Sequence, residues 1–218
     1  MFQRQHVLRC SLGGTALAIA ATIIAASQVT AADPCRIATY DTPTGETYYA
    51  LSLRPTEQAA PVAAAEVVVL FDTSASQTGA YRDDALAALR SMFAQLGPQD
   101  RVQLMALDLN AVPMTDGFVT PGSPELQAGI QKLQSRTPLG STDIRRGMQG
   151  ALGSFANDSG AARAVIYIGD GMSRAKLLQT GDFAALSDQL VAKRVAVSSF
   201  AIGPGQDVAL LASLANHT

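Results

Sequence analysis

Asp72, Ser74 and Ser76 carry oxygen-bearing side chains at every second position of the stretch Asp72-Thr73-Ser74-Ala75-Ser76. The stretch follows the apolar run 67–71 and precedes an amphipathic helical pattern, so it is expected to form a loop at the carboxyl end of a buried strand. Open α/β sheets bind their ligands at that end. One carboxylate and two hydroxyls form an all-oxygen set of low charge, which suits a hard cation such as Mg²⁺. The stretch therefore predicts metal binding.

Two further loops carry residues of the same type. Thr142 lies just before a helix predicted to begin near Ile144, and Asp170 follows the apolar run 164–168 within a Gly-Asp-Gly triplet. Because the carboxyl ends of parallel strands meet at one edge of a sheet, both side chains are expected near Asp72. Each residue also has a simpler interpretation, as a helix cap, a turn residue or a partner of a helix dipole.

Strands and helices alternate along most of the chain. Four apolar runs rich in Val and Ile have the pattern of buried parallel strands, namely 67–71, 102–107, 164–168 and 195–202. Apolar residues at helical spacing follow these runs, with stripes through Leu86, Met148 and Leu186 and a last helix at 207–215. The alternation predicts an α/β fold, doubly wound, with a mostly parallel sheet and helices on both faces.

The three loops, taken in order, resemble those of a von Willebrand factor type A domain over about residues 64–218. Strand-Asp-x-Ser-x-Ser, Gly-x-Thr before a helix and strand-Gly-Asp-Gly match the metal-ion-dependent adhesion site of that Rossmann-like family. The resemblance implies that Ser74, Ser76 and Thr142 bind a metal through their hydroxyls. It also implies that Asp72 and Asp170 act directly or through water. Gly169 and Gly171 are expected to let the backbone turn around Asp170.

The balance of charge in this site favours binding over catalysis. Two carboxylates and three neutral hydroxyls leave a divalent cation with no surplus negative charge around it. Mg²⁺ prefers six oxygen ligands and keeps waters, one of which an external carboxylate can replace. The resemblance implies capture of an Asp or Glu side chain of a partner protein through Mg²⁺, or through Mn²⁺ or Ca²⁺.

The sequence lacks the side chains and motifs that common hydrolytic enzymes use for catalysis. The only histidines are His6 and His217, which lie near the two ends of the chain, and no Gly-x-Ser-x-Gly sequence is present. We therefore expect no enzyme. A Mg²⁺-dependent hydrolase without a histidine and a scaffold domain with a purely structural metal remain alternatives.

The N-terminus has the pattern of a secretory signal. Residues 1–31 combine a basic start, a short apolar run and small residues that predict cleavage near Ala31 or Ala32. The mature chain is thus expected to be secreted, periplasmic or at the cell surface. No second apolar run is long enough to span a membrane. The net charge is −2 and the sequence has no basic cluster, so nothing in its charge indicates nucleic-acid binding.

The domain plan has three parts. Residues 32–62 are expected to form a β-hairpin followed by an Ala/Pro-rich linker, and residues 63–218 the α/β domain. The resemblance implies a further edge strand and closing helix, which we expect to be missing after Thr218. Cys35 is the only cysteine beyond the signal, so no internal disulfide is expected.

Overall fold

The structure is a computed structural model that describes residues 35–53, 64–156 and 160–218. The predicted signal peptide and most of the predicted linker lie outside the described residues. The chain divides into two compact units, Met1–Gln58 and Ala59–Thr218, and each is described by itself. None of the helices within the described residues is long and apolar enough to cross a membrane.

The first unit contains the expected hairpin. Strands β1 (Cys35–Asp41) and β2 (Thr47–Leu53) pair antiparallel along their whole length. Gly45 allows the connecting turn because its φ is +86°, a value that glycine adopts without a steric penalty. Every side chain of the two strands is exposed, including the free Cys35.

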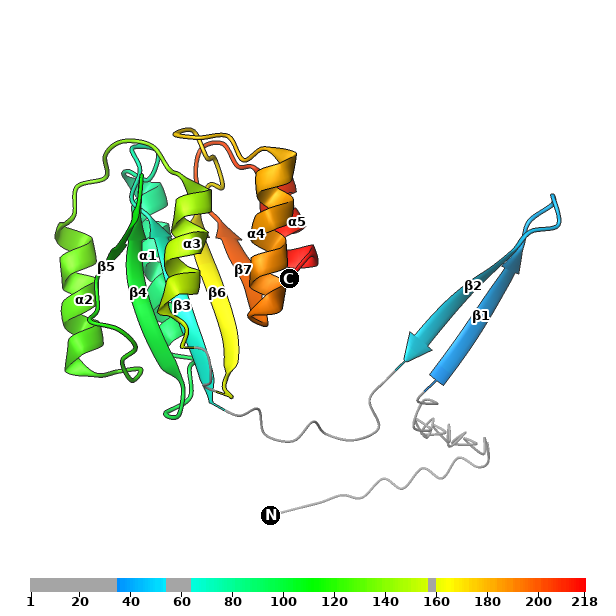
Figure 1. Ribbon diagram of the computed structural model, residues 1–218, viewed down its shortest axis with the longest axis horizontal. Coiled ribbons are helices and arrows are strands. Elements are labelled where there is room, and N and C mark those ends of the chain that lie inside the picture. The colour runs from blue at the N-terminus through cyan, green and yellow to red at the C-terminus, as the bar shows by residue number, and fades with distance from the viewer. Residues whose placement is uncertain (1–34, 54–63, 157–159) are drawn as a thin grey trace, which may run out of the picture. The chain divides into compact units, whose positions relative to one another are not determined.

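The second unit is built on a five-stranded sheet in the order β5-β4-β3-β6-β7 (Figure 1). All neighbours pair in parallel except β5, which runs antiparallel to β4. The strands are β3 (Ala65–Asp72), β4 (Arg101–Leu107), β5 (Ala111–Pro113), β6 (Ala162–Gly169) and β7 (Val195–Ala201). This arrangement confirms the predicted mostly parallel α/β sheet.

Within the described residues, five helices cover the two faces of this sheet (Figure 1). One face carries α1 and α2, and the other carries α3, α4 and α5. They are α1 (Ala80–Phe93), α2 (Pro124–Ser135), α3 (Ile144–Ser154), α4 (Thr180–Ala192) and α5 (Val208–Asn216). Alternate residues of the central strand β3 pack into the two layers, Val69 and Phe71 on one side and Val68 and Leu70 on the other. That double burial explains why the strand is apolar throughout.

The register of the sheet brings three strand ends to one level. Phe71 in β3 pairs with Ile168 in β6, and Asp72 pairs with Leu107 in β4. Helix α3 begins at the same edge of the sheet. The Asp143 side chain accepts a hydrogen bond from the Arg146 amide and thereby caps this helix. The loops that follow β3 and β6 therefore meet the loop that precedes α3.

Candidate metal centre

All five predicted site residues lie together at the carboxyl edge of the sheet. Asp72 is the last residue of β3, and Ser74 and Ser76 follow it in the next loop. Thr142 lies two residues before α3, and Asp170 directly follows β6. Four of the five side chains are buried and Ser76 is partly exposed, so the cluster opens to solvent on the side of Ser76.

Hydrogen bonds join these side chains into one network. The Thr142 hydroxyl donates to the Asp72 carboxylate, with 3.0 Å to each oxygen, and the Ser76 hydroxyl donates to Oδ2 of Asp170 over 2.6 Å. The two serine hydroxyls lie 3.1 Å apart, and the Ser74 amide donates to Oδ1 of Asp72 over 2.8 Å. A hydroxyl that gives its proton to a carboxylate keeps its lone pairs available for a cation.

The two carboxylates have no basic partner. Asp72 is 0% exposed and Asp170 is 2% exposed, yet no lysine or arginine among the described residues forms an ion pair with either. Burial raises the pKa of Asp72, hydrogen bonds from Ser74 and Tyr167 oppose that shift, and the nearby charge of Asp170 adds to it. Buried negative charge without a counterion is costly, so this site favours a cation.

Backbone hydrogen bonds hold the first two loops in place. The amide of Ala75 donates to the carbonyl of Gly140 over 3.1 Å, and the amide of Leu139 donates to the carbonyl of Thr73 over 3.0 Å. Arg136 adds a side-chain link, since it forms an ion pair with Asp108 and its Nε donates to Oγ1 of Thr73 over 3.3 Å. The loop that carries Thr142 is thereby fastened to the loop that carries the serines.

The sequence did not indicate two residues that support the site. Arg136 lies between the predicted elements, and nothing in its sequence context set it apart. Tyr167 lies within an apolar run and looked like ordinary core, yet its hydroxyl donates to Oδ2 of Asp72 over 2.7 Å. The only available signal was the single hydroxyl-bearing side chain in that run, at a position that faces the layer of α3.

Glycines next to the acids have distinct reasons to be glycine. Gly171 has a φ of +77°, as expected for a tight turn after Asp170. Gly169 instead lies within β6 without a positive φ, so the predicted turning role is wrong for this residue. A Cβ atom at Gly169 would lie 2.5 Å from Cβ of Asp72 and 2.5 Å from the hydroxyl oxygen of Tyr167. Space, and not backbone conformation, requires glycine there.

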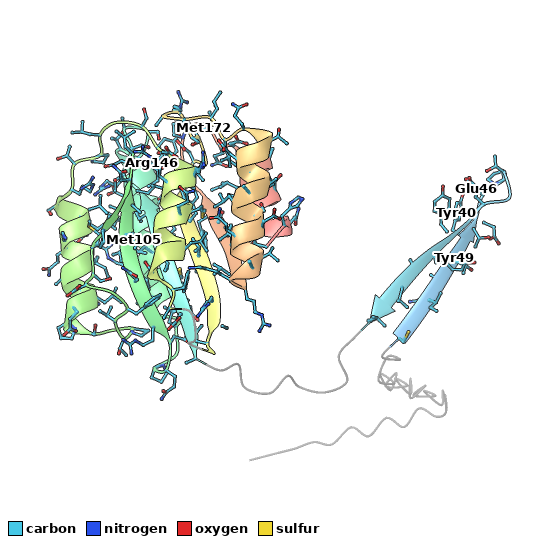
Figure 2. The ribbon with its side chains drawn as sticks, viewed as in Figure 1. Tyr40, Glu46, Tyr49, Met105, Arg146 and Met172 are labelled. Carbon is cyan, nitrogen blue, oxygen red and sulfur yellow. The ribbon has the colours of Figure 1, made fainter. Side chains whose placement is uncertain are left out.

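Exposed cations flank one side of the cluster. The amide of Ala175 donates to the carbonyl of Thr142 over 3.1 Å, which places Arg174 and Lys176 beside the site. Arg146 lies in the first turn of α3, and its side chain is 62% exposed. Figure 2 shows Arg146 and Met172 at the same end of the α/β unit. We call Arg146, Arg174 and Lys176 the basic rim.

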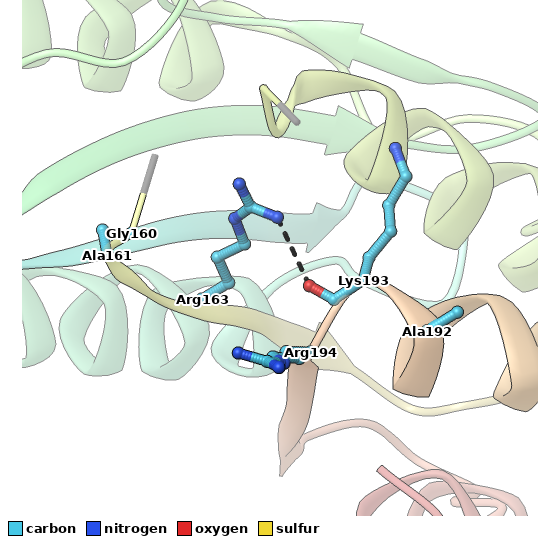
Figure 3. Close-up of a pocket in the computed structure, with 6 residues that line it drawn as sticks. All are labelled: Gly160, Ala161, Arg163, Ala192, Lys193 and Arg194. Atoms are coloured by element: carbon cyan, nitrogen blue, oxygen red, sulfur yellow. Dashed lines mark hydrogen bonds between the residues drawn. The ribbon is translucent and has the colours of Figure 1, made fainter. Parts of the chain in front are cut away.

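A hollow of about 420 Å³ lies away from this site, where β6 and β7 begin (Figure 3). Its lining includes Arg163, Lys193 and Arg194, but none of the predicted site residues. Arg163 donates to the carbonyl of Lys193 over 3.3 Å, and the Lys193 amine donates to the carbonyl of Leu152 over 3.0 Å. These two side chains hold the backbone at helix ends and do not converge on a common point.

Comparisons with known proteins agree on the α/β unit. Residues 65–218 match the model of a family described as von Willebrand factor type A domain. A von Willebrand factor type A protein from Catenulispora acidiphila superposes with a TM-score of 0.63 at 15% identity, covering 78% of this chain and 39% of that one. The chain thus spans about two fifths of that protein.

Two further solved structures share the fold at similarly low identity. BatB, a conserved hypothetical protein from Bacteroides thetaiotaomicron, gives a TM-score of 0.56 at 17% identity, over 70% of this chain and 86% of that one. Manganese-loaded TRAP protein from Plasmodium vivax gives a TM-score of 0.55 at 16% identity. The match covers 71% of this chain and 63% of that one. At these identities the likeness establishes the fold.

Proposed function

The chain belongs to the von Willebrand factor type A family, and on that premise we propose that its α/β unit is a metal-dependent protein-binding domain. The family commonly binds divalent metals and mediates contacts between proteins. In this chain the metal would be held by Asp72, Ser74, Ser76, Thr142 and Asp170. The proposal includes capture of an Asp or Glu side chain of a partner protein.

The observation that carries this proposal is that Asp72 and Asp170 are buried and form no ion pair with a basic side chain among the described residues. Within the described residues, no three His, Cys, Asp or Glu side chains gather closely enough to hold a metal by themselves. The donor set therefore has to include the hydroxyls, and Thr142 and Ser76 already direct their protons to Asp72 and Asp170. A mixed set of carboxylate and hydroxyl oxygens suits Mg²⁺ or Mn²⁺. The manganese found in the similar TRAP protein supports the same choice.

Binding of an acidic partner follows from the charge of such a site. A bound divalent cation supplies a position that accepts a carboxylate of the partner in place of water. The chain's own carboxylates supply two negative charges, so the loaded site carries no net negative charge to repel an acid. The basic rim adds an attraction for further acidic groups around that carboxylate.

Isothermal titration with MgCl₂ and MnCl₂ tests the metal site. We expect the wild-type protein to bind one cation and Thr142→Ala to bind it much more weakly. Ser141→Ala is the matched control, because this neighbouring hydroxyl belongs to none of the network's hydrogen bonds. Absence of cation binding by the wild-type protein, or equal binding by Thr142→Ala, would contradict the proposal.

The proposal also places the domain outside the cytoplasm, on the basis of the signal pattern in residues 1–31. N-terminal sequencing of the protein recovered from an exporting host tests this part. We expect the mature chain to begin within a residue or two of Ala32. A chain that retains Met1 would contradict it.

A further inference from the structure

Tyr167 differs from the other tyrosines of this chain in its environment. It is 0% exposed, whereas Tyr40, Tyr48, Tyr49 and Tyr81 are between 41% and 74% exposed. A phenol carries its proton at neutral pH, and the Tyr167 hydroxyl uses that proton in a hydrogen bond to Asp72. Tyr167 is therefore the one tyrosine in the sequence that presents its O–H donor to the interior of the protein.

The Tyr167 hydroxyl links two of the loops that form the candidate metal centre. It donates to Oδ2 of Asp72 over 2.7 Å and accepts a hydrogen bond from the Gly171 amide over 3.1 Å. Gly171 directly follows Asp170. One phenol oxygen thus connects a carboxylate at the end of β3 with the turn that carries the second carboxylate.

Three donors hold the Asp72 carboxylate from different directions. The Ser74 amide binds Oδ1, Tyr167 binds Oδ2, and the Thr142 hydroxyl lies 3.0 Å from both oxygens. Among them, only Tyr167 reaches the carboxylate from the core, since its ring packs in the layer of α3, α4 and α5. Loss of this donor would leave a buried oxygen with fewer partners and a carboxylate freer to turn.

Gly169 keeps the path between the phenol and the carboxylate open. Any side chain at this position would bring its Cβ within 2.5 Å of the Tyr167 oxygen and of Asp72 Cβ. The hydrogen bond from Tyr167 to Asp72 thus requires glycine at position 169. This pairing is hard to explain by core packing alone, because an aliphatic residue would fill the layer without placing a polar atom there.

We propose that Tyr167 is a positioning residue of the metal centre, which sets the orientation of Asp72 toward the cation. This inference rests on the proposed function, since it requires that a cation binds. Groups that orient a metal ligand through a hydrogen bond typically change metal affinity by about 10- to 100-fold when they are removed. We expect a loss of that size for Tyr167→Phe, which deletes one oxygen and keeps the ring.

The test is titration of the full chain with MgCl₂ alone. Tyr81→Phe, at an exposed tyrosine in α1, is the matched control and should bind like the wild type. Thermal unfolding in EDTA checks that both variants are folded. If the wild type binds Mg²⁺ and folded Tyr167→Phe binds it equally well, the inference is overturned. If the wild type does not bind, the proposed function fails instead.

A spectroscopic measurement on the wild type keeps the inference testable even if Tyr167→Phe does not fold. The chain has no tryptophan, so its near-ultraviolet absorption is dominated by five tyrosines. A cation beside Asp72 draws negative charge away from the carboxylate that the phenol binds, which should shift the Tyr167 band. We expect a tyrosine difference spectrum on saturation with Mg²⁺ in the wild type, and the same spectrum in Tyr81→Phe. Saturation without any such difference would also overturn the inference.

Discussion

Asp72 has the most demanding position of the predicted ligands, because its carboxylate is fully buried and accepts hydrogen bonds from three donors. The donors favour the ionised form, whereas burial and Asp170 favour the protonated form. An acid with a raised folded-state pKa lowers stability as the pH rises from its ordinary pKa of 3.8 through the raised value. Above the raised pKa, the buried charge of Asp72 therefore lowers the stability of the protein without metal.

Asp72→Asn tests this balance because it removes the charge and nearly preserves the shape. We expect the variant to lose Mg²⁺ binding and to melt at a higher temperature than the wild type in EDTA at pH 7. Asp188→Asn, at an exposed position in α4, should change neither property. A lower melting temperature for Asp72→Asn would mean that the hydrogen bonds to the charged carboxylate outweigh the cost of burying it.

Gly169→Ala should destabilise the protein because the new methyl group would overlap Asp72 and Tyr167. Overpacking of this kind costs about 1–3 kcal/mol. Gly153→Ala in α3 is the matched control, since nothing lies within 4 Å of the added methyl group and alanine favours helix by roughly 1 kcal/mol. Chemical denaturation measures both changes, and equal stability of Gly169→Ala and wild type would contradict the packing argument.

The sequence indicated the residues of the site but not what supports them. The spacing of Asp72, Ser74 and Ser76 at every second position placed them in one loop, and the structure brings Thr142 and Asp170 beside them. Their role as metal ligands stays a prediction. Tyr167 could not be identified from the sequence. A strand pattern predicts the face on which a residue lies, but it does not predict a hydrogen bond to a residue 95 positions away.

At the level of elements, the strands matched the prediction to within a few residues, because buried parallel strands are marked by continuous apolar runs. Helix α2 was not predicted, although Ser123 caps it, Pro124 begins it and Leu126, Ile130 and Leu133 are buried along it. Strand β5 is only three residues long and gives no periodic signal. A strand as short as β5 forms because of its contacts with the neighbouring strand, and its own sequence does not predict it.

The loop between β6 and α4 should contribute to partner binding through the basic rim. We expect the double variant Arg174→Glu, Lys176→Glu to bind the acetylated, amidated peptide Gly-Glu-Asp-Glu-Gly about three- to tenfold more weakly in Mg²⁺. Exposed charge pairs contribute roughly 0.2–1 kcal/mol each. Fluorescence polarisation of the labelled peptide gives the affinity, and titration calorimetry should show unchanged Mg²⁺ binding.

Arg90→Glu provides the control for this charge reversal, because Arg90 is exposed in the last turn of α1, away from the metal edge. It should leave peptide binding unchanged. Equal peptide affinity for the double variant and the wild type would exclude Arg174 and Lys176 from recognition, whether or not the metal binds.

At the level of the whole molecule, the α/β unit contains the entire candidate site, and the hairpin unit contributes none of its residues. The hairpin buries no side chain within the described residues. An isolated two-stranded hairpin is at best marginally stable in water. Stability and metal binding should therefore be read from the α/β unit, whose two apolar layers enclose the sheet.

The register between β3 and β6 also has a kinetic consequence. The Thr142–Asp72 contact joins residues 70 apart in the chain, and the Ser76–Asp170 contact joins residues 94 apart. Such contacts form only after long loops have closed and β3 has paired with β6. A cation would then find its ligands assembled only late in folding. Stopped-flow measurements should show that Mg²⁺ slows unfolding and leaves the refolding rate unchanged. Faster refolding in Mg²⁺ would mean that these loops meet before the transition state.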